Sequence, residues 1–192
     1  YLDLAKITKV IALAAYTNVV KAETNKRKCM VDTVTTASVT SKCCNEKSIP
    51  IIYLSTDYVI PIKKGLKSPF YSTCKFLAEG EAKDNGACIV RISFVTPEQV
   101  ADWRWANDYT ISKRWWVEDA AENLCRYINS QSKEKEVNLG PRTPTTNYRM
   151  LAARYPHHPA LLYRIWSCAG IKEKTGIQLP KNTQFSKIFT DY

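Results

Sequence analysis

The sequence predicts an α/β fold built on a parallel sheet, and the order of its apolar segments is the main reason. Residues 8–16, 49–55 and 87–94 are short, nearly continuous apolar runs, typical of strands buried on both faces. The longer segments 19–47 and 71–84 between them have mixed polarity and are predicted to be helical. Strand, helix, strand, helix, strand is the alternation of right-handed βαβ units.

After Pro97 the chain changes character, which predicts a second, smaller lobe. We therefore divide the chain into a domain at 1–96 and a lobe at 97–192. Tryptophans are concentrated at the start of that lobe; they could stack on bases, but more often such residues pack one lobe on another. Within the lobe we expect helices at 117–129, 145–154 and 160–170 and a short strand at 136–139, and before it a loop at 58–70.

Composition excludes several classes of protein. The chain is 45% apolar and 24% charged, as in globular domains, and no apolar run approaches the ~20 residues of a membrane span. The net charge of +10 favours phosphate-bearing ligands, although a solvated basic surface is the commoner explanation, and no motif points to nucleic acid. Seven cysteines without a C-x-x-C spacing predict neither zinc nor a disulfide framework, so we expect reduced thiols in a cytoplasmic protein and no metal site.

Glycine is the residue whose distribution matters most. All six glycines lie at or after Gly65, so the first predicted strand is not followed by a glycine-rich turn. Such a turn normally binds the pyrophosphate of a dinucleotide at the start of a helix.

Polar residues follow the strand at 49–55. Ser55, Thr56 and Asp57 stand where ligands bind in open parallel sheets, outside the carboxyl ends of the strands. The same residue types also favour simple turns, so position alone supports a substrate site and a strand-ending turn equally.

A tyrosine and a lysine follow one helical turn apart. On the predicted helix 71–84, Tyr71 and Lys75 lie on the same face, and a lysine beside a phenol favours phenolate, so that the tyrosine can act as a general acid near neutral pH. The pattern is weak alone, because Tyr109 and Lys113 repeat it in the irregular region. Only the first pair follows a strand that ends in Ser-Thr-Asp.

These motifs together resemble the extended short-chain dehydrogenase/reductases, specifically the dTDP-4-dehydrorhamnose reductase (RmlD-like) branch. The resemblance implies a Rossmann-like parallel sheet that lacks its N-terminal glycine-rich half, with a small C-terminal substrate lobe. Five segments carry the resemblance: 13–23, 49–59, 68–79, 89–95 and 180–185.

The resemblance implies a role for each matched residue. Thr56 would hydrogen-bond the reacting carbonyl of a nucleotide-linked sugar, with Asp57 beside it in the substrate site. Tyr71 would donate the proton, and Lys75 would hold the nicotinamide ribose and tune Tyr71. The backbone of Ala14, Ala15 and Tyr16 would line the cofactor, which is NADH or NADPH.

Two functions from different classes remain open. The first is an NAD(P)-dependent reductase, intact or as a truncated fragment, of a nucleotide-linked 4-keto-6-deoxysugar, as in dTDP-rhamnose biosynthesis. The second is a non-catalytic relative that works through a protein partner, like the regulatory beta subunit of methionine adenosyltransferase. The pattern Thr56, Tyr71 and Lys75 favours the enzyme, whereas the missing glycine turn favours the binding role. Neither reading expects a nucleic-acid or membrane partner.

Overall fold

The fold was determined as a computed structural model that describes residues 6–165, apart from 64, 66, 67, 102, 104, 105, 108–112, 131, 133 and 163. The chain forms two compact units, one of residues Tyr1–Ile92 with Ile128–Leu139 and one of residues Ser93–Tyr127 with Gly140–Tyr192. The two units therefore divide inside a strand. The sequence predicts a division by function, with a domain at 1–96 and a lobe at 97–192, and this division stays a prediction.

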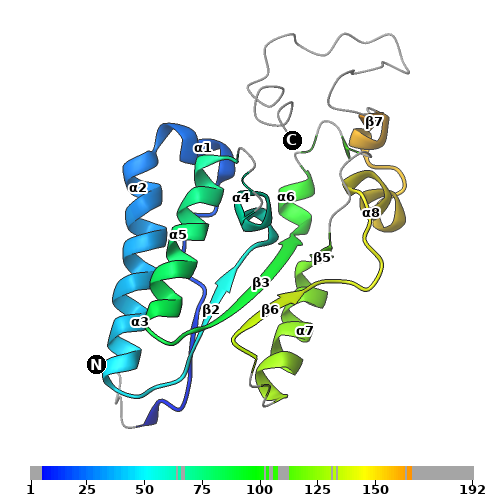
Figure 1. The fold of residues 1–192 in the computed structure, drawn as a ribbon. Helices are drawn as coiled ribbons and strands as arrows, with labels where there is room; N and C mark the ends of the chain where they lie inside the picture. Colours follow the sequence, from blue (N-terminus) through cyan, green and yellow to red (C-terminus); the bar gives the residue numbers. More distant parts are fainter. Residues whose placement is uncertain are drawn as a thin grey trace. The chain divides into compact units, whose positions relative to one another are not determined.

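The sheet of the first unit is parallel, as the sequence predicts. Strand β1 (Val10–Ala12) pairs with β2 (Ile51–Ser55), β2 pairs with β3 (Cys88–Val95), and β6 (Glu136–Leu139) pairs with β3 (Figure 1). All three pairings are parallel, so the carboxyl ends of β1, β2 and β3 lie at one edge of the sheet.

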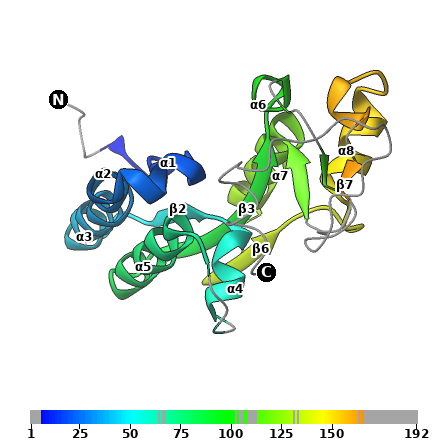
Figure 2. The same ribbon diagram turned by 90° about the horizontal axis from the view of Figure 1, so that it is seen from above.

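Helices cover one face of this sheet. The segment predicted as one helix at 19–47 contains α1 (Val19–Thr24), α2 (Lys26–Met30), a π-helical turn (Val31–Thr35) and α3 (Thr36–Glu46). Helix α5 (Phe70–Asp84) lies beside α3 (Figures 1 and 2). Small side chains at the contact, mostly alanines, let the helices approach β2 and β3 closely. The buried core of this contact is Ala37, Cys44, Ile51, Tyr53, Ala78, Ala82, Ala87 and Ile89.

Strand β1 corrects one expectation from the sequence. The segment 8–16 was predicted as a strand buried on both faces, but only Val10–Ala12 is a strand, and Ile11 and Leu13 are 40% and 58% exposed. The reason is its position: among the described residues β1 has β2 as its only neighbour, so it forms an open edge.

The segment at 58–70 also differs from its prediction as a loop. It begins with a 3-10 turn (Asp57–Val59) and the short helix α4 (Ile60–Lys63). Pro61 is compatible with a helix there because the first turn of a helix has no use for its missing N–H.

The second unit contains further helices around its own core. Helix α7 (Val117–Asn129) has the bounds that the sequence predicts, as has strand β6 of the first unit. Helix α8 (Asn147–Arg154) lies within the predicted 145–154. The helix predicted at 160–170 is wrong where the structure describes it, because a 3-10 turn (Pro159–Leu162) and strand β7 (Arg164–Ile165) replace it. The remaining elements are α6 (Pro97–Ala101), β4 (Ala106–Asn107) and β5 (Arg114–Trp116).

Tryptophans stabilise the core of this second unit. Trp103 and Trp116 pack against its buried residues, among them Met150 and Leu151, and Trp116 meets the ring of Tyr155 edge to face at 5.5 Å. Trp105, Tyr109 and the segment 180–185 lie outside the described residues. Across the described part of the chain, no helix has the length and apolar content that crossing a membrane requires.

An ion cluster with a buried pair at its centre joins α5 to β3 and β6 in the first unit. Arg91 donates two hydrogen bonds to Glu79, at 2.7 and 2.5 Å, and a third to Glu136 at 2.7 Å. Lys63 and Lys83 complete the cluster around the two carboxylates. The hydrogen bond from Lys83, and then the one from Arg91, hold the pKa of Glu136 at about 2.

This cluster generates a prediction about stability. The side chains of Arg91 and Glu79 are 4% and 3% exposed, so Arg91→Ala leaves a buried carboxylate with only the half-buried Lys63, 3.5 Å away, as a cationic partner. We expect the variant to lose about 3–5 kcal/mol in its free energy of unfolding, measured with urea. The matched control is Arg126→Ala, whose partner Glu122 is 60% exposed and whose pair is worth at most about 0.5 kcal/mol. Equal losses in the two variants would contradict the assigned role of the cluster.

Candidate active site

The candidate site lies at the carboxyl edge of the sheet, where the segments that follow β1 and β2 meet the start of α5. Residues 14–16 follow β1 directly, and Thr56 and Asp57 follow β2. Parallel pairing brings these two strand ends together although they are forty residues apart in sequence.

Thr56 begins the 3-10 turn that leaves β2. Its buried Oγ1 accepts a hydrogen bond from the backbone N–H of Tyr58 at 3.3 Å and donates one to Asp57 Oδ1 at 3.3 Å. The hydroxyl therefore serves the turn, as the simpler interpretation of the sequence requires. The hydroxyl also lies at the carboxyl end of β2, where a substrate site was expected. A strand-ending turn and a substrate site are therefore compatible at this position.

Helix α5 begins with a cap supplied by another helix. Pro69 precedes it and offers no side-chain cap, and the backbone N–H of Phe70 instead donates to Glu23 Oε1 of α1 at 2.8 Å. This carboxylate satisfies one of the donors that every helix start leaves unpaired. The bond also fixes the first turn of α5, which carries Tyr71.

Tyr71 lies next to the turn that Thr56 begins. Its ring meets the ring of Tyr58 at 89°, with the centroids 6.3 Å apart, and it packs against the buried thiols of Cys29 and Cys74. Burial, followed by the nearby Tyr58, Cys29 and Asp57, raises the pKa of the Tyr71 phenol above its ordinary value. Lys75 is not among the groups that act on this pKa, so the lowering that the sequence predicts for Tyr71 is wrong for the unliganded chain. The phenol carries its proton at neutral pH, but burial makes it a weaker acid than a free tyrosine.

Lys75 is buried one turn further along α5. Its Nζ donates to the backbone carbonyl of Leu54 at 2.8 Å and to Tyr53 Oη at 3.1 Å. Burial lowers the pKa of Lys75 to about 8, while the carboxylate of Glu79 acts in the opposite direction. The ammonium thus sits at the last residues of β2, immediately before Thr56.

The three residues expected to line a cofactor follow β1. Tyr16 donates its backbone N–H to Thr33 Oγ1 at 3.1 Å and packs against the same buried cluster as Tyr71. Ala14 is exposed and Ala15 is half-buried. The structure therefore brings Tyr16 and Tyr71 to one cluster and leaves Ala14 accessible.

The donors near these residues suit the ribose half of a nicotinamide nucleotide. Ribose hydroxyls need hydrogen-bonding hydroxyl and ammonium groups, which Tyr71 and Lys75 supply. Two further hydroxyls beside them, Ser55 and Ser72, are buried and have no hydrogen-bond partner within the described structure. The donor set fits that half of the molecule, whereas the segment that follows β1 supplies no glycine turn for its pyrophosphate.

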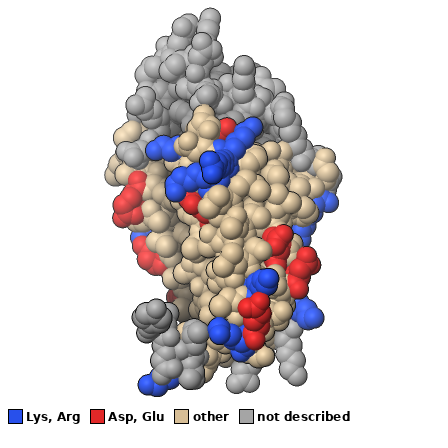
Figure 3. All heavy atoms as spheres, turned by 90° about the vertical axis from the view of Figure 1, so that its left-hand side faces the viewer, with Lys and Arg blue, Asp and Glu red and all other residues tan. Residues whose placement is uncertain are grey.

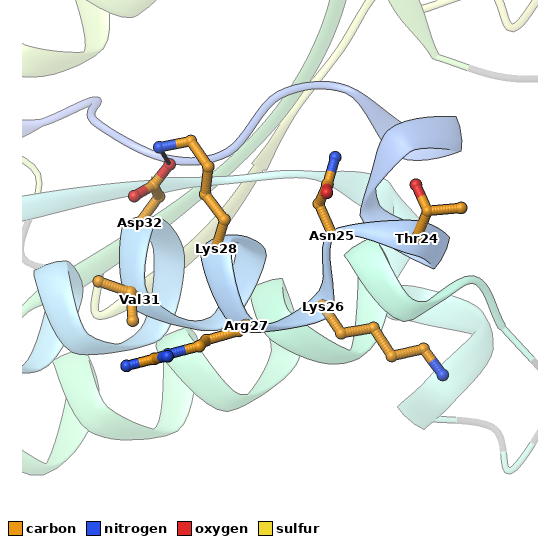
Figure 4. Close-up of a pocket in the computed structure, with 7 residues that line it drawn as sticks. All are labelled: Thr24, Asn25, Lys26, Arg27, Lys28, Val31 and Asp32. Carbon is orange, nitrogen blue, oxygen red and sulfur yellow. Dashed lines mark ion pairs between the residues drawn. The ribbon is translucent and has the colours of Figure 1, made fainter.

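A second feature, at the junction of α1 and α2, is an open depression lined by consecutive cations. Lys26, Arg27 and Lys28 leave the helix in different directions, and Lys28 is paired with Asp32 at 2.9 Å (Figure 4). Figure 3 shows a group of positive side chains in the upper part of the face in view, and further positive side chains mixed with negative ones lower down. Because these three side chains diverge, the depression does not present converging donors to one phosphate group.

Two residues of the candidate site were not singled out from the sequence. Tyr53 is one of many apolar residues in a predicted strand, and Glu23 is one acid among many in a predicted helix. The signal for Tyr53 was the alternation of side chains along a strand, which places it on the same face as Ser55, two residues later. The contact of Glu23 joins residues 47 positions apart, and local sequence carries no sign of it.

A parallel sheet, with a tyrosine–lysine helix beside a Ser-Thr-Asp strand end, defines a Rossmann-like α/β protein. The family model described as "RmlD substrate binding domain" matches residues 1–98, and the chain belongs to this family. Comparison with curated protein sequences gives no match.

Solved structures support the same fold. A dTDP-4-dehydrorhamnose reductase from Bacillus anthracis, in complex with NADP, is 17% identical with a TM-score of 0.67, over 83% of this chain and 66% of that one. A hypothetical dTDP-4-dehydrorhamnose reductase from Sulfolobus tokodaii is 16% identical with a TM-score of 0.67, over 86% and 72%.

A third structure belongs to a different reaction. The NAD-dependent NDP-hexosamine 5,6-dehydratase TunA, involved in tunicamycin biosynthesis, is 18% identical with a TM-score of 0.64, over 85% of this chain and 65% of that one. At these identities the likeness shows the fold alone. The chain spans about two thirds of the length of the B. anthracis reductase and of TunA.

The buried lysine generates a prediction about pH. The pKa of Lys75 is about 8 in the folded chain and near 10.5 when unfolded, so between these values the unfolded chain binds the extra proton. Stability therefore rises with pH in this window. We expect the free energy of unfolding of the wild type to gain about 2 kcal/mol relative to Lys75→Met between pH 8 and pH 10.

Urea unfolding at pH 7, 8, 9 and 10 measures this difference. Lys42→Met, which replaces an exposed lysine on α3, is the matched control and should follow the wild type at every pH. If Lys75→Met also runs parallel to the wild type, the lysine titrates normally and its burial has been misassigned.

Proposed function

We propose that this chain carries the catalytic half of an NAD(P)-dependent reductase acting on a nucleotide-linked 4-keto-6-deoxysugar, of the dTDP-4-dehydrorhamnose type. The observation that carries the proposal is the meeting of Tyr71 with the turn at Asp57 and Tyr58, with Lys75 buried one helical turn away at the end of β2. Membership of the RmlD family and the nucleotide-sugar enzymes among the similar folds support the substrate class.

In this proposal the residues divide the work of a carbonyl reduction. The reduced nicotinamide, when bound, supplies the hydride that reduces the keto carbon. Thr56 turns its hydroxyl proton from Asp57 Oδ1 to the keto oxygen, and Tyr71 gives that oxygen its phenolic proton, so the ketone becomes an alcohol. Lys75 binds the nicotinamide ribose and stabilises the phenolate that Tyr71 becomes until solvent returns the proton.

In this proposal the chain alone binds its dinucleotide cofactor weakly. A glycine-rich turn normally gives a dinucleotide several charge-assisted hydrogen bonds, each worth about 1.5–3 kcal/mol. The segment that follows β1 contains no glycine, and the edge of β1 where a further parallel strand would pair is open among the described residues. We infer that the site is completed when a strand–glycine turn–helix unit pairs with that edge.

A second function is favoured by the same open edge. Ile11 and Leu13 on the edge segment, with Val31 and Val39 on the neighbouring helical layer, are exposed apolar residues of a kind that protein partners cover. A non-catalytic relative would use this surface to bind a protein. The non-catalytic function would be recognised by a stable complex with a protein partner and by the absence of sugar reduction.

A cofactor titration tests the proposal. We expect the chain alone to bind NADPH or NADH at least about a hundredfold more weakly than a fusion that adds a strand–glycine turn–helix unit before residue 1, because at least two charge-assisted hydrogen bonds are missing. Nicotinamide fluorescence measures the affinity of each chain for both cofactors. Micromolar affinity of the unfused chain would show that other residues replace the turn.

Turnover separates the two functions. The fusion should reduce dTDP-4-keto-6-deoxysugars, and Tyr71→Phe in the fusion should abolish that rate while leaving cofactor affinity nearly unchanged. Tyr155→Phe, which removes a phenol in the other unit, is the control and should keep the rate. A fusion that binds cofactor tightly and reduces no sugar would favour the non-catalytic function.

A further inference from the structure

Tyr53 is the fully buried phenol of β2, and its environment is unusual for a core position. Only 1% of the residue is exposed, and it belongs to the apolar core between the sheet and helices α3 and α5. A hydroxyl in such a place costs free energy unless it has a polar partner, and a phenylalanine would fill the same space without that cost. The polar partner here is Lys75, whose Nζ lies 3.1 Å from Tyr53 Oη.

The ammonium of Lys75 is bound to β2 on two sides. Of its three donors, one goes to Tyr53 Oη and one to the carbonyl of Leu54, which leaves one for a ligand or for Tyr71. The ammonium also lies 4.7 Å from the centroid of the Tyr53 ring, within the range of a cation–π contact. Two neighbouring residues of one strand therefore define where the charge sits.

We propose that Tyr53 is a positioning residue, which holds the Lys75 ammonium at the carboxyl end of β2 through the hydrogen bond between Tyr53 Oη and Lys75 Nζ. The consequence for the site rests on the proposed function. Two N–H groups of the ammonium are bound to β2, and the third remains for a ligand or for Tyr71. The strand, and not the flexible lysine side chain, sets the direction of that third N–H. A lysine stem has four rotatable carbons, so without this anchor its head would be free to move.

The groups around Lys75 define what the anchor does. Tyr53 faces it from β2, Glu79 from α5 and Cys29 from α2. Glu79 is paired with Arg91, so the ammonium relies on two neutral oxygens of β2, the Leu54 carbonyl and the Tyr53 hydroxyl, of which only the second belongs to a side chain. Burial, and then the nearby Tyr71, raise the pKa of the Tyr53 phenol above its ordinary value, so Tyr53 stays a neutral partner of the ammonium.

The test follows the Lys75 side chain itself, in the full chain and without substrate. Lysines are labelled with 13C at Cε, the Lys75 resonance is assigned with Lys75→Arg, and its titration is recorded from pH 6 to pH 11. In Tyr53→Phe the buried ammonium loses an acceptor, so we expect its pKa to fall from about 8 by about one to two. Tyr155→Phe, in which the lost phenol packs on Trp116 of the other unit, should leave the titration unchanged. An unchanged Lys75 titration in folded Tyr53→Phe overturns the proposal.

A second measurement needs no variant and decides the matter if Tyr53→Phe does not fold. In the wild type, the Lys75 ammonium should show magnetisation transfer to the ring protons of Tyr53, and its absence overturns the proposal. A cofactor titration in parallel keeps the two hypotheses apart. If Tyr53→Phe leaves the pKa of Lys75 unchanged while the chain or the fusion binds NADPH, only the role of Tyr53 is contradicted. If Tyr53→Phe lowers the pKa of Lys75 while neither the chain nor the fusion binds a cofactor, the role of Tyr53 is supported and the reductase function is contradicted.

Discussion

The contact between α5 and the sheet is the interaction on which the rest of the candidate site depends. Tyr71, Lys75 and Glu79 stand four residues apart along α5, and one face of the helix therefore presents them in a row. Each of the three has partners at a different position on the sheet. Tyr71 lies by the turn after β2, and Lys75 binds Tyr53 and Leu54 within β2. Glu79 is paired with Arg91 of β3. Cys74, Ala78 and Ala82 fill the apolar space beside this row.

This row fixes the register of the helix more strictly than apolar packing could. Alanines alone would let α5 slide or turn with little loss, because one small side chain replaces another. A rotation by one residue would remove a buried ammonium and a buried carboxylate from their partners, and an unpaired buried charge costs several kcal/mol. The ion pair between Arg91 and Glu79 and the bond between Tyr53 and Lys75 therefore hold Tyr71 at one place at the sheet edge.

Much of the fold of the first unit could be predicted from the sequence, because its signals are local. Apolar runs marked the positions of β2 and β3 within one or two residues, and α5 begins one residue before its predicted start. The failure at β1 has a physical cause: an apolar run of this kind indicates a strand, but it does not say whether neighbours exist to cover it. The turn at Asp57–Val59 and helix α4 could not be predicted, because Pro61 and Gly65 are residue types typical of loops, although proline is tolerated in the first turn of a helix.

The site divides in the same way between what is local and what is not. Thr56, Tyr71 and Lys75 could be singled out because strand end and helical spacing are visible in sequence. Glu23, which caps α5, and Tyr53, which binds Lys75, act across 47 and 22 positions, and only the parallel arrangement of the strands and helices brings them in. Both act on the position of a proposed functional group and not on a ligand. A sequence motif can therefore indicate the proposed functional residues, whereas the residues that position them are found only in the fold.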